Sequence, residues 1–348
     1  MRRHRRDHPI QTPVRLKTPT DRYAEAFLGR IRQRSPRRGA RHALSPHRTP
    51  LLAGRHRLTR HWFWTCSISR GRLPGNRPAD DPGRQIGAFM ELSDVSAPES
   101  HRLTALATTN YGHFTTMRAE GRRVRGLSLH LERLRRDCRV VFGAELDPDQ
   151  VRARVNDALA DTRDPVTVRV TVFDPGLRLD RPGAVACPRL LVTTRPAAGE
   201  RPPLRVRTAS HCQEVPMVKH TGLFGALHER RLSQLAGFDD ALFTDGRSAV
   251  TEGPTWNIGF FDGARVVWPA ADVLPGVAMA LLRRYHTGAQ HTAEIGVAHL
   301  SGMEAAFATN SAFGICPIAS INEVKYDVEH PILRQLRGEY ESVIPEQL

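Results

Sequence analysis

The stretch 216–260 constrains this chain more than any other, because it opens around Lys219, one of only three lysines among the 348 residues. An amine, unlike a guanidinium, can lose its proton near neutral pH and attack a carbonyl to form a Schiff base. A short apolar run at 240–244, an Asp-Gly turn and Glu252 follow. This order predicts a strand, a tight turn and a second strand that carries an acid. The residues alone leave a plain alternative open, in which Lys219 is a surface lysine on a loop.

The net charge of +15 is unevenly distributed. Residues 1–89 hold 21 Lys and Arg against 5 Asp and Glu, whereas residues 90–348 hold 30 against 31. The first segment is rich in Arg, Pro, His and Gly, so we expect a disordered basic extension that cannot bury enough apolar surface to fold. It could be a nucleic-acid-binding tail, a transit peptide or a translated leader before a true start at Met90. We favour the leader, and we expect no nucleic acid partner.

Cysteine usage and hydropathy limit the class of protein. The five cysteines are odd in number and scattered without metal-ligand spacing, which favours free thiols in the cytoplasm and no metal site. No run approaches the roughly 18 apolar residues that a membrane helix needs, so no membrane span is expected.

Residue periodicity predicts two α/β domains. Strands are expected over 111–118, 122–127, 166–173, 189–194 and 204–208, and helices from Leu127, from Pro148, over 222–236 and from Val277. The Pro/Gly-rich segment 195–203 is the expected linker between a small domain, 90–194, and a larger one, 204–348. Within the helix at 222–236, four leucines are expected to face inward: Leu223, Leu227, Leu232 and Leu235.

Lys219, Glu252-Gly253 and Asn257 occur in an order and spacing that resembles the pyridoxal-phosphate enzymes of fold type IV. This family includes branched-chain aminotransferases, D-amino-acid aminotransferases and aminodeoxychorismate lyases. The resemblance extends over roughly residues 111–321 and implies an α/β fold of two domains with pyridoxal phosphate between them. It also implies small-molecule amino acid and 2-oxo acid substrates and a homodimer.

The resemblance assigns a role to individual residues. Lys219 would form the Schiff base and then move a proton, while Glu252 would keep the pyridine nitrogen protonated. Arg133, in the His-x-x-Arg-Leu sequence at 130–134, would bind the phosphate with its planar fork, whereas the residues alone favour one of several solvated arginines on this helix. The remaining assignments are Asn257, Val277, Ala278 and Ser311 for the cofactor and Tyr111, Arg169, Asn310 and Ala312 for the substrate.

Two of these assignments also have support from the residues themselves. The first amides of a helix at Val277 and Ala278 form a ready anion site, because they are unpaired and the helix dipole is positive there. Arg169 interrupts an apolar strand on the face of Thr167 and Thr171, where it could meet a carboxylate or simply lie on a polar face.

The chain departs from the family at three positions, which leaves the reaction open. Phe224 stands where branched-chain enzymes carry a tyrosine, Gly222 where lyases carry an asparagine, and the region of Met279 where an arginine follows the phosphate turn. We therefore expect an aminotransferase, with 4-amino-4-deoxychorismate lyase, which eliminates pyruvate, as the alternative. A non-catalytic or nucleic-acid-binding protein is a third interpretation, which the near-neutral charge of residues 90–348 disfavours.

Overall fold

The computed structural model describes residues 97–160, 162 and 165–348. The chain divides into two units, Met1–Pro82 and Gly83–Leu348, and every described residue lies in the second. The expected basic extension at 1–89 and the expected start at Met90 lie outside the described residues.

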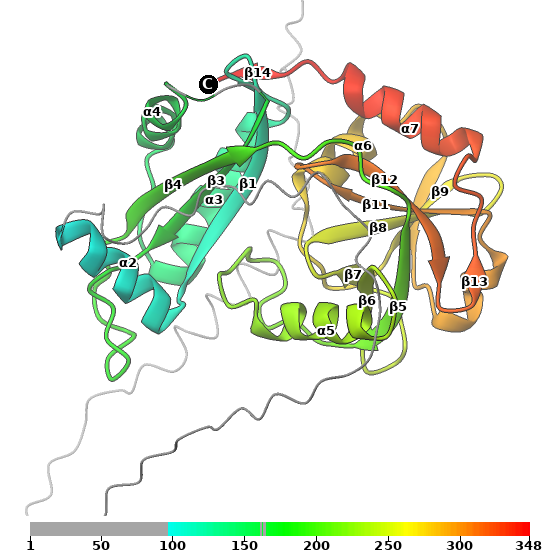
Figure 1. Ribbon diagram of the computed structural model, residues 1–348, viewed down its shortest axis with the longest axis horizontal. Coiled ribbons are helices and arrows are strands. Elements are labelled where there is room, and N and C mark those ends of the chain that lie inside the picture. The colour runs from blue at the N-terminus through cyan, green and yellow to red at the C-terminus, as the bar shows by residue number, and fades with distance from the viewer. Residues whose placement is uncertain (1–96, 161, 163–164) are drawn as a thin grey trace, which may run out of the picture. The chain divides into compact units, whose positions relative to one another are not determined.

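The first sheet has five strands in the order β14-β2-β1-β3-β4, and every neighbouring pair is antiparallel (Figure 1). Its strands are β1 (Gly112–Glu120), β2 (Arg123–Val124), β3 (Val166–Phe173), β4 (Arg189–Pro196) and β14 (Glu346–Gln347). The helices that precede or connect them are α2 (Ala97–Thr109), α3 (Leu127–Phe142) and α4 (Pro148–Ala158). Strand β14 lies at the end of the chain, so the last residues pair with the sheet that contains β1, the first described strand.

The apolar face predicted for the helix at 127 is confirmed. Leu127, Leu131, Leu134 and Cys138 are all buried and pack with strand residues such as Val168 in one cluster. Burying a side chain of this size contributes roughly 1.5–3 kcal/mol. This packing fixes α3 against the sheet, and the polar groups that α3 carries are therefore held in fixed places.

The predicted strand at 122–127 is wrong beyond Val124. Gly126 adopts a left-handed conformation with φ of 67°, which ends the extended chain, and Leu127 already belongs to α3. A Cβ on Gly126 would collide with Val277 and Leu281, so the start of α3 lies directly against α6.

The second sheet has nine strands, ordered β10-β9-β8-β11-β12-β5-β6, with β13 on β12 and β7 on β8. Its strands are β5 (Leu204–Ser210), β6 (Asp240–Thr244), β7 (Glu252–Gly253), β8 (Trp256–Phe261), β9 (Val266–Pro269), β10 (Gln290–Ala293), β11 (Ala305–Asn310), β12 (Gly314–Ile321) and β13 (Val324–Lys325). The helices between them are α5 (Phe224–Leu235), α6 (Val277–Tyr285), the 3-10 helix η2 (Val297–Gly302) and α7 (Pro331–Ser342).

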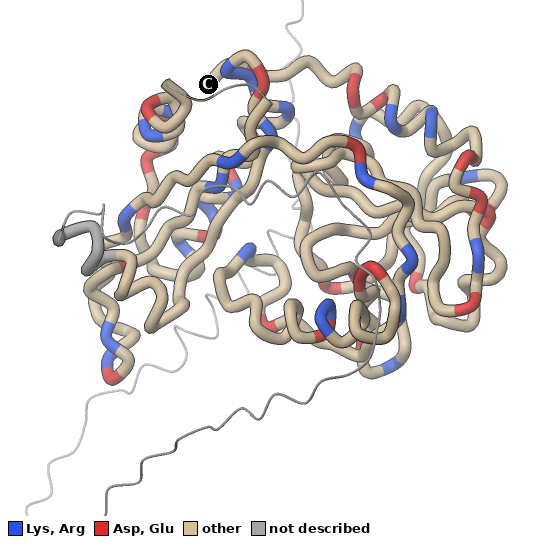
Figure 2. Tube along the Cα trace, viewed as in Figure 1, with Lys and Arg blue, Asp and Glu red and all other residues tan. Residues whose placement is uncertain are grey.

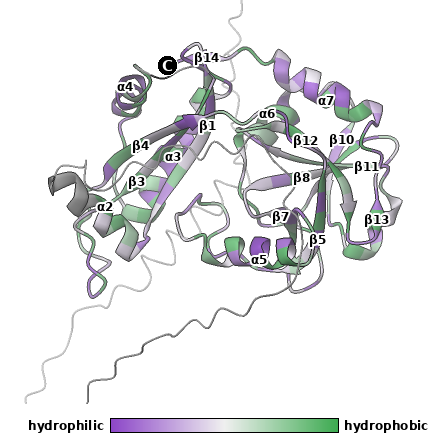
Figure 3. Cartoon of the chain, viewed as in Figure 1, coloured by the Kyte–Doolittle hydropathy of each residue, from purple (hydrophilic) through white to green (hydrophobic). Residues whose placement is uncertain are grey.

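Two apolar clusters hold this second sheet. One joins α6 and α7 to strand residues that include Trp268 and Phe307, whose rings meet edge to face at 5.5 Å between centroids. The other cluster includes Ile258, Phe260 and Leu242. Figure 3 shows mixed polar and apolar colouring along α5 and α7.

The prediction for the leucines of α5 is wrong. Leu227, Leu232 and Leu235 are 48%, 38% and 69% exposed, and the buried residues of this helix are Ala226 and Ser233. At about 100° per residue, the four leucines spread over half the helix circumference and form no single stripe. The small side chain of Ala226 packs instead in a cluster with residues of β5 and β6.

The predicted α/β class is confirmed by these two sheets and their helices. Basic and acidic residues are interspersed along the described trace (Figure 2). Among the described residues, no helix is long and apolar enough to cross a membrane. The four described cysteines are free thiols, of which Cys138 and Cys316 are buried.

Candidate active site

A cavity of about 480 Å³ collects side chains from both sheets. Phe114 and Thr116 of β1, Arg133 of α3 and Arg169 of β3 come from the first sheet and its helix. Further lining residues come from β4 and the segment after it, from α5 and the segment before it, from β7 and β8, from the start of α6 and from the loop after β11. Nine of the eleven residues predicted for the site line this one cavity: Arg133, Arg169, Lys219, Glu252, Asn257, Val277, Asn310, Ser311 and Ala312.

Lys219 is held in the cavity through its own backbone. Its carbonyl accepts a hydrogen bond from the Phe114 amide at 2.8 Å, and its amide donates to Asp137 Oδ2 at 3.1 Å. The amine nitrogen lies 5.0 Å from the centroid of the Phe114 ring. Burial, and next the positive charge of Arg133, lower the pKa of Lys219 to about 8, against the opposing attraction of Glu252. The amine is therefore partly neutral near physiological pH.

Glu252 is buried in the same cavity without a guanidinium partner. Its carboxylate accepts hydrogen bonds from Asn257 Nδ2 at 3.1 Å and from the Leu274 amide at 3.3 Å. The antiparallel pairing of β7 with β8 sets Glu252 directly opposite Asn257. Burial raises the pKa of Glu252 to about 8, although the Leu274 hydrogen bond and Lys219 oppose the rise. A cationic or proton-donating group beside it would be stabilised.

Arg133 retains unused hydrogen-bonding capacity in the cavity wall. It is 7% exposed, and its Nη2 donates to Thr115 Oγ1 at 2.5 Å, while Thr115 also bonds His130 Nδ1 at 2.7 Å. Its Nε is buried and has no partner among the described residues. Burial lowers the pKa of Arg133 to about 10, so the group remains charged. A buried cation with a free donor is suited to an anionic ligand.

The start of α6 lies beside Glu252. Asn257 Nδ2 donates to the Leu274 carbonyl at 2.8 Å as well as to Glu252. A Cβ on Gly276 would collide with Asn257 Oδ1, so only glycine permits this close approach. Val277, the first residue of α6, lines the cavity, whereas Ala278 is fully buried and does not.

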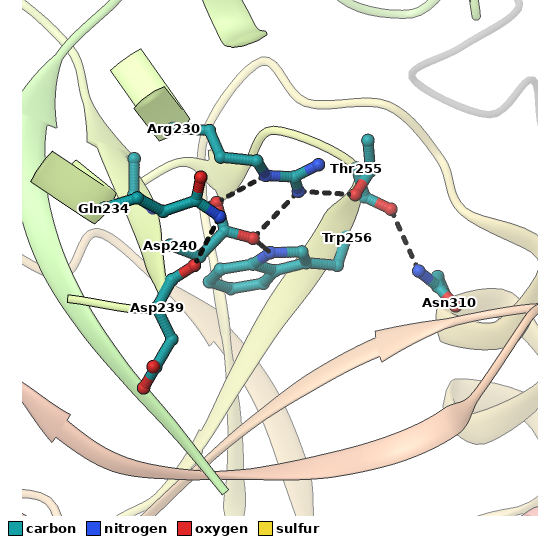
Figure 4. Close-up of polar contacts among 8 residues, drawn as sticks. Arg230, Gln234, Asp239, Asp240, Thr255, Trp256 and Asn310 are labelled. Carbon is teal, nitrogen blue, oxygen red and sulfur yellow. Dashed lines mark hydrogen bonds and ion pairs between the residues drawn. The ribbon is translucent and has the colours of Figure 1, made fainter. Parts of the chain in front are cut away.

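The loop after β11 is fixed by Asn310. Its Nδ2 donates to the Thr255 carbonyl at 3.1 Å, and its Oδ1 accepts from the amides of Ala312 and Phe313 at 2.9 and 3.1 Å (Figure 4). The side-chain amide of Asn310 thus connects the loop after β11 with the loop before β8. Ser311 and Ala312 line the cavity between them.

The sequence analysis missed an ion pair whose arginine, Arg230, lines the cavity. Arg230 of α5 forms a two-pronged contact with Asp240, at 2.9 and 2.8 Å, and also donates to Thr255 Oγ1 at 2.8 Å. Asp240 accepts a third side-chain hydrogen bond, from Trp256 Nε1, at 2.9 Å (Figure 4). These four side chains hold the loop before β8 in place. The sequence gives no sign of the pair, because a separation of ten residues between Arg230 and Asp240 matches no helix or strand period.

Besides Arg133 and Arg230, three arginines line the cavity: Arg169, Arg195 and Arg201. The Arg169 guanidinium stacks 3.6 Å from the Phe114 ring centroid, and burial followed by repulsion from Arg195 lowers its pKa. Arg195 and Arg201 belong to the segment expected to be a linker, so that segment forms part of the cavity wall. Among the described residues that line the cavity, Glu252 is the single acid.

Tyr111, predicted to bind substrate, lies away from the cavity lining. It is 43% exposed, and its hydroxyl donates to the Val141 carbonyl at 3.1 Å. Phe224, at the position of the family's tyrosine, is 81% exposed. The sequence analysis missed Phe114 and Thr116, which the alternation of β1 could have identified because they share one face.

Residues 112–321 match the family described as amino-transferase class IV. No curated protein matches the chain at a significant level. Among solved structures, the chain is similar to a candidate 4-amino-4-deoxychorismate lyase from Legionella pneumophila. The identity is 20%, the TM-score is 0.61, and the match covers 69% of this chain and 93% of that one.

Two further solved structures show the same likeness. For a branched-chain aminotransferase from Thermoproteus uzoniensis the identity is 19% and the TM-score 0.60, covering 68% of this chain and 86% of that one. For a hypothetical aminotransferase from Mycobacterium tuberculosis in its PLP-bound form the identity is 17% and the TM-score 0.61. That match covers 69% of this chain and 90% of the other. These likenesses show that the described fold is that of the fold type IV enzymes.

We predict that Lys219 of cofactor-free protein reacts with an acylating reagent at half its maximal rate near pH 8. Only the neutral amine attacks, and burial lowers the pKa of Lys219 to about 8, roughly two units below an ordinary lysine. Peptide-resolved mass spectrometry measures the rate, and the exposed Lys325 is the control in the same molecule. A midpoint for Lys219 above about pH 10 would contradict the burial described here.

Proposed function

This chain belongs to the class IV aminotransferases, and we propose that it transfers an amino group between an amino acid and a 2-oxo acid. It is a pyridoxal-phosphate-dependent enzyme. The observation that carries the proposal is one cavity in which an amine of lowered pKa, Lys219, meets a buried acid, Glu252, and a buried cation, Arg133.

The residues of the cavity fit pyridoxal phosphate. Arg133 has a buried Nε without a partner among the described residues, and α6 begins at the cavity wall, so both suit a phosphate. Glu252 accepts hydrogen bonds from neutral donors only, which suits a protonated ring nitrogen. Among the residues that the structure describes, Lys219 supplies the one amine that lines the cavity. When bound, the cofactor supplies an electron sink for the charge left on the substrate's α-carbon.

Each of these residues has a defined task in the proposed reaction. Lys219 Nζ removes the proton from the α-carbon of the substrate, a task suited to a base of pKa about 8. The ionised Glu252 carboxylate would stabilise a proton on the cofactor's ring nitrogen. Arg169, with Arg195 near it, binds the substrate carboxylate and keeps it oriented.

The finer organisation is also proposed. Two sheets with separate apolar clusters support domains at 90–194 and 204–348, joined by 195–203, with β14 of the second range returning to pair with β2 of the first sheet. The exposed apolar residues of α5, such as Phe224 and Leu235, support a homodimer. The free thiols support a cytoplasmic location.

A panel of amino donors and 2-oxo acids tests the proposed reaction. Cofactor-loaded protein should form a new amino acid from at least one pair, and the Lys219→Ala variant should form none, since it lacks the base. 4-Amino-4-deoxychorismate belongs in the panel as the substrate of the alternative lyase. Release of pyruvate from it, with no amino transfer from any donor, would contradict the aminotransferase assignment.

We predict that Glu252→Gln slows turnover at least tenfold while cofactor loading persists. The amide keeps the shape of the carboxylate but loses the charge that stabilises a protonated ring nitrogen, and each pKa unit corresponds to about 1.36 kcal/mol. Single-turnover kinetics measures the proton-removal step, with the exposed Glu323→Gln as the matched control. Near-normal proton removal in Glu252→Gln would show that its charge plays no part.

A further inference from the structure

Helix α3 carries two buried charged groups one turn apart, Arg133 and Asp137. Residues four apart lie on the same face of a helix, about 6 Å from one another. Asp137 is 0% exposed, although carboxylates are rarely buried without a partner. The contacts of Asp137 show what its burial achieves.

Asp137 and its neighbour Arg136 hold the chain around Lys219. Arg136 donates to Asp137 Oδ1 through Nε at 3.0 Å and Nη2 at 2.7 Å. Asp137 Oδ2 accepts the Lys219 amide at 3.1 Å, and Arg136 Nη2 donates to the Met217 carbonyl at 2.6 Å. The pair therefore bonds to the backbone on both sides of Val218, which is itself buried.

These contacts matter because the segment around Lys219 has little regular structure of its own. It lies between β5 and α5, and Val215 within it adopts a positive φ of 48°. On its other side, β1 holds the carbonyl of Lys219 through the Phe114 amide, and Gly112 accepts the amide of Thr221 at 2.9 Å. Both backbone polar groups of Lys219 are thus fixed by the first sheet and its helix.

We propose that Asp137, oriented by Arg136, is a positioning residue that holds Lys219 at a set distance from Arg133. The proposal rests on the proposed roles of Lys219 and Arg133. Both Arg133 and Asp137 belong to α3. One turn of this helix therefore sets the distance between Arg133, the proposed phosphate ligand, and Lys219, the proposed Schiff-base residue.

The charge of Asp137 has a second effect. The charged or titratable groups that face Lys219 are Arg133, Arg169, Glu252, Asp137 and His130. Asp137 raises the pKa of the lysine and so offsets part of the lowering by Arg133. Burial raises the pKa of Asp137 itself, which the Arg136 fork opposes.

Two variants separate the positioning effect from the charge effect. Asp137→Asn retains an oxygen that can accept the Lys219 amide but loses the charge, whereas Asp137→Ala loses both. The matched control is Glu145→Gln, which breaks the exposed ion pair of Glu145 with Arg139 of the same helix. Full-length, cofactor-free protein is acylated across pH, and Lys219 is compared with Lys325. In parallel, borohydride reduction measures how fast added pyridoxal phosphate becomes attached to Lys219.

Asp137→Asn should lower the pH at which Lys219 is half-reacted and keep most of the attachment rate. Asp137→Ala should slow attachment at least tenfold, and Glu145→Gln should change neither readout. An unchanged attachment rate in Asp137→Ala would overturn the proposal. If Asp137→Ala fails to fold, an unchanged midpoint of Lys219 acylation in Asp137→Asn would overturn it instead. If the parent protein attaches no cofactor, the proposed function fails, while the acylation profile still tests Asp137.

Discussion

Removal of an amine and a carboxylate from water, within one cavity, is the constraint on which this structure depends. Burial lowers the pKa of Lys219 and raises that of Glu252, so both come to about 8. Near neutral pH their protonated and deprotonated forms then differ by only about 1 kcal/mol. A ligand that brings a cation to Glu252 and a carbonyl to Lys219 can therefore determine the protonation state of each residue. Such a pair would have no use on a solvated surface, where both groups would stay charged.

The two sheets hold different residues of this cavity in place. The second sheet provides Glu252 and Asn257 in strand register, while α3 and β1 of the first sheet fix Arg133 and the backbone of Lys219. Each sheet has its own apolar cluster, so the positions of these groups follow from packing that lies outside the cavity. The arginines that line the cavity add an excess of positive charge that suits carboxylate-bearing ligands.

Sequence patterns predicted the parts of this arrangement that depend on local periodicity. The apolar face of α3, the strand at 166–173 and the Asp147 cap of α4 all follow from residues close together in the chain. Asp137 could not be predicted in this way, because its importance arises where α3 meets a segment some 80 residues later. The wrong leucine face of α5 has a related cause, since a helix that contacts a sheet through small residues leaves large ones exposed.

Reductive trapping of the cofactor tests the central claim most directly. The full-length protein is mixed with pyridoxal phosphate, reduced with borohydride and digested, and the modified peptide is identified by mass spectrometry. The chain has three lysines, Lys17, Lys219 and Lys325, so the assignment is unambiguous. The account predicts one modified residue, Lys219. Attachment to another lysine, or to none, would contradict it.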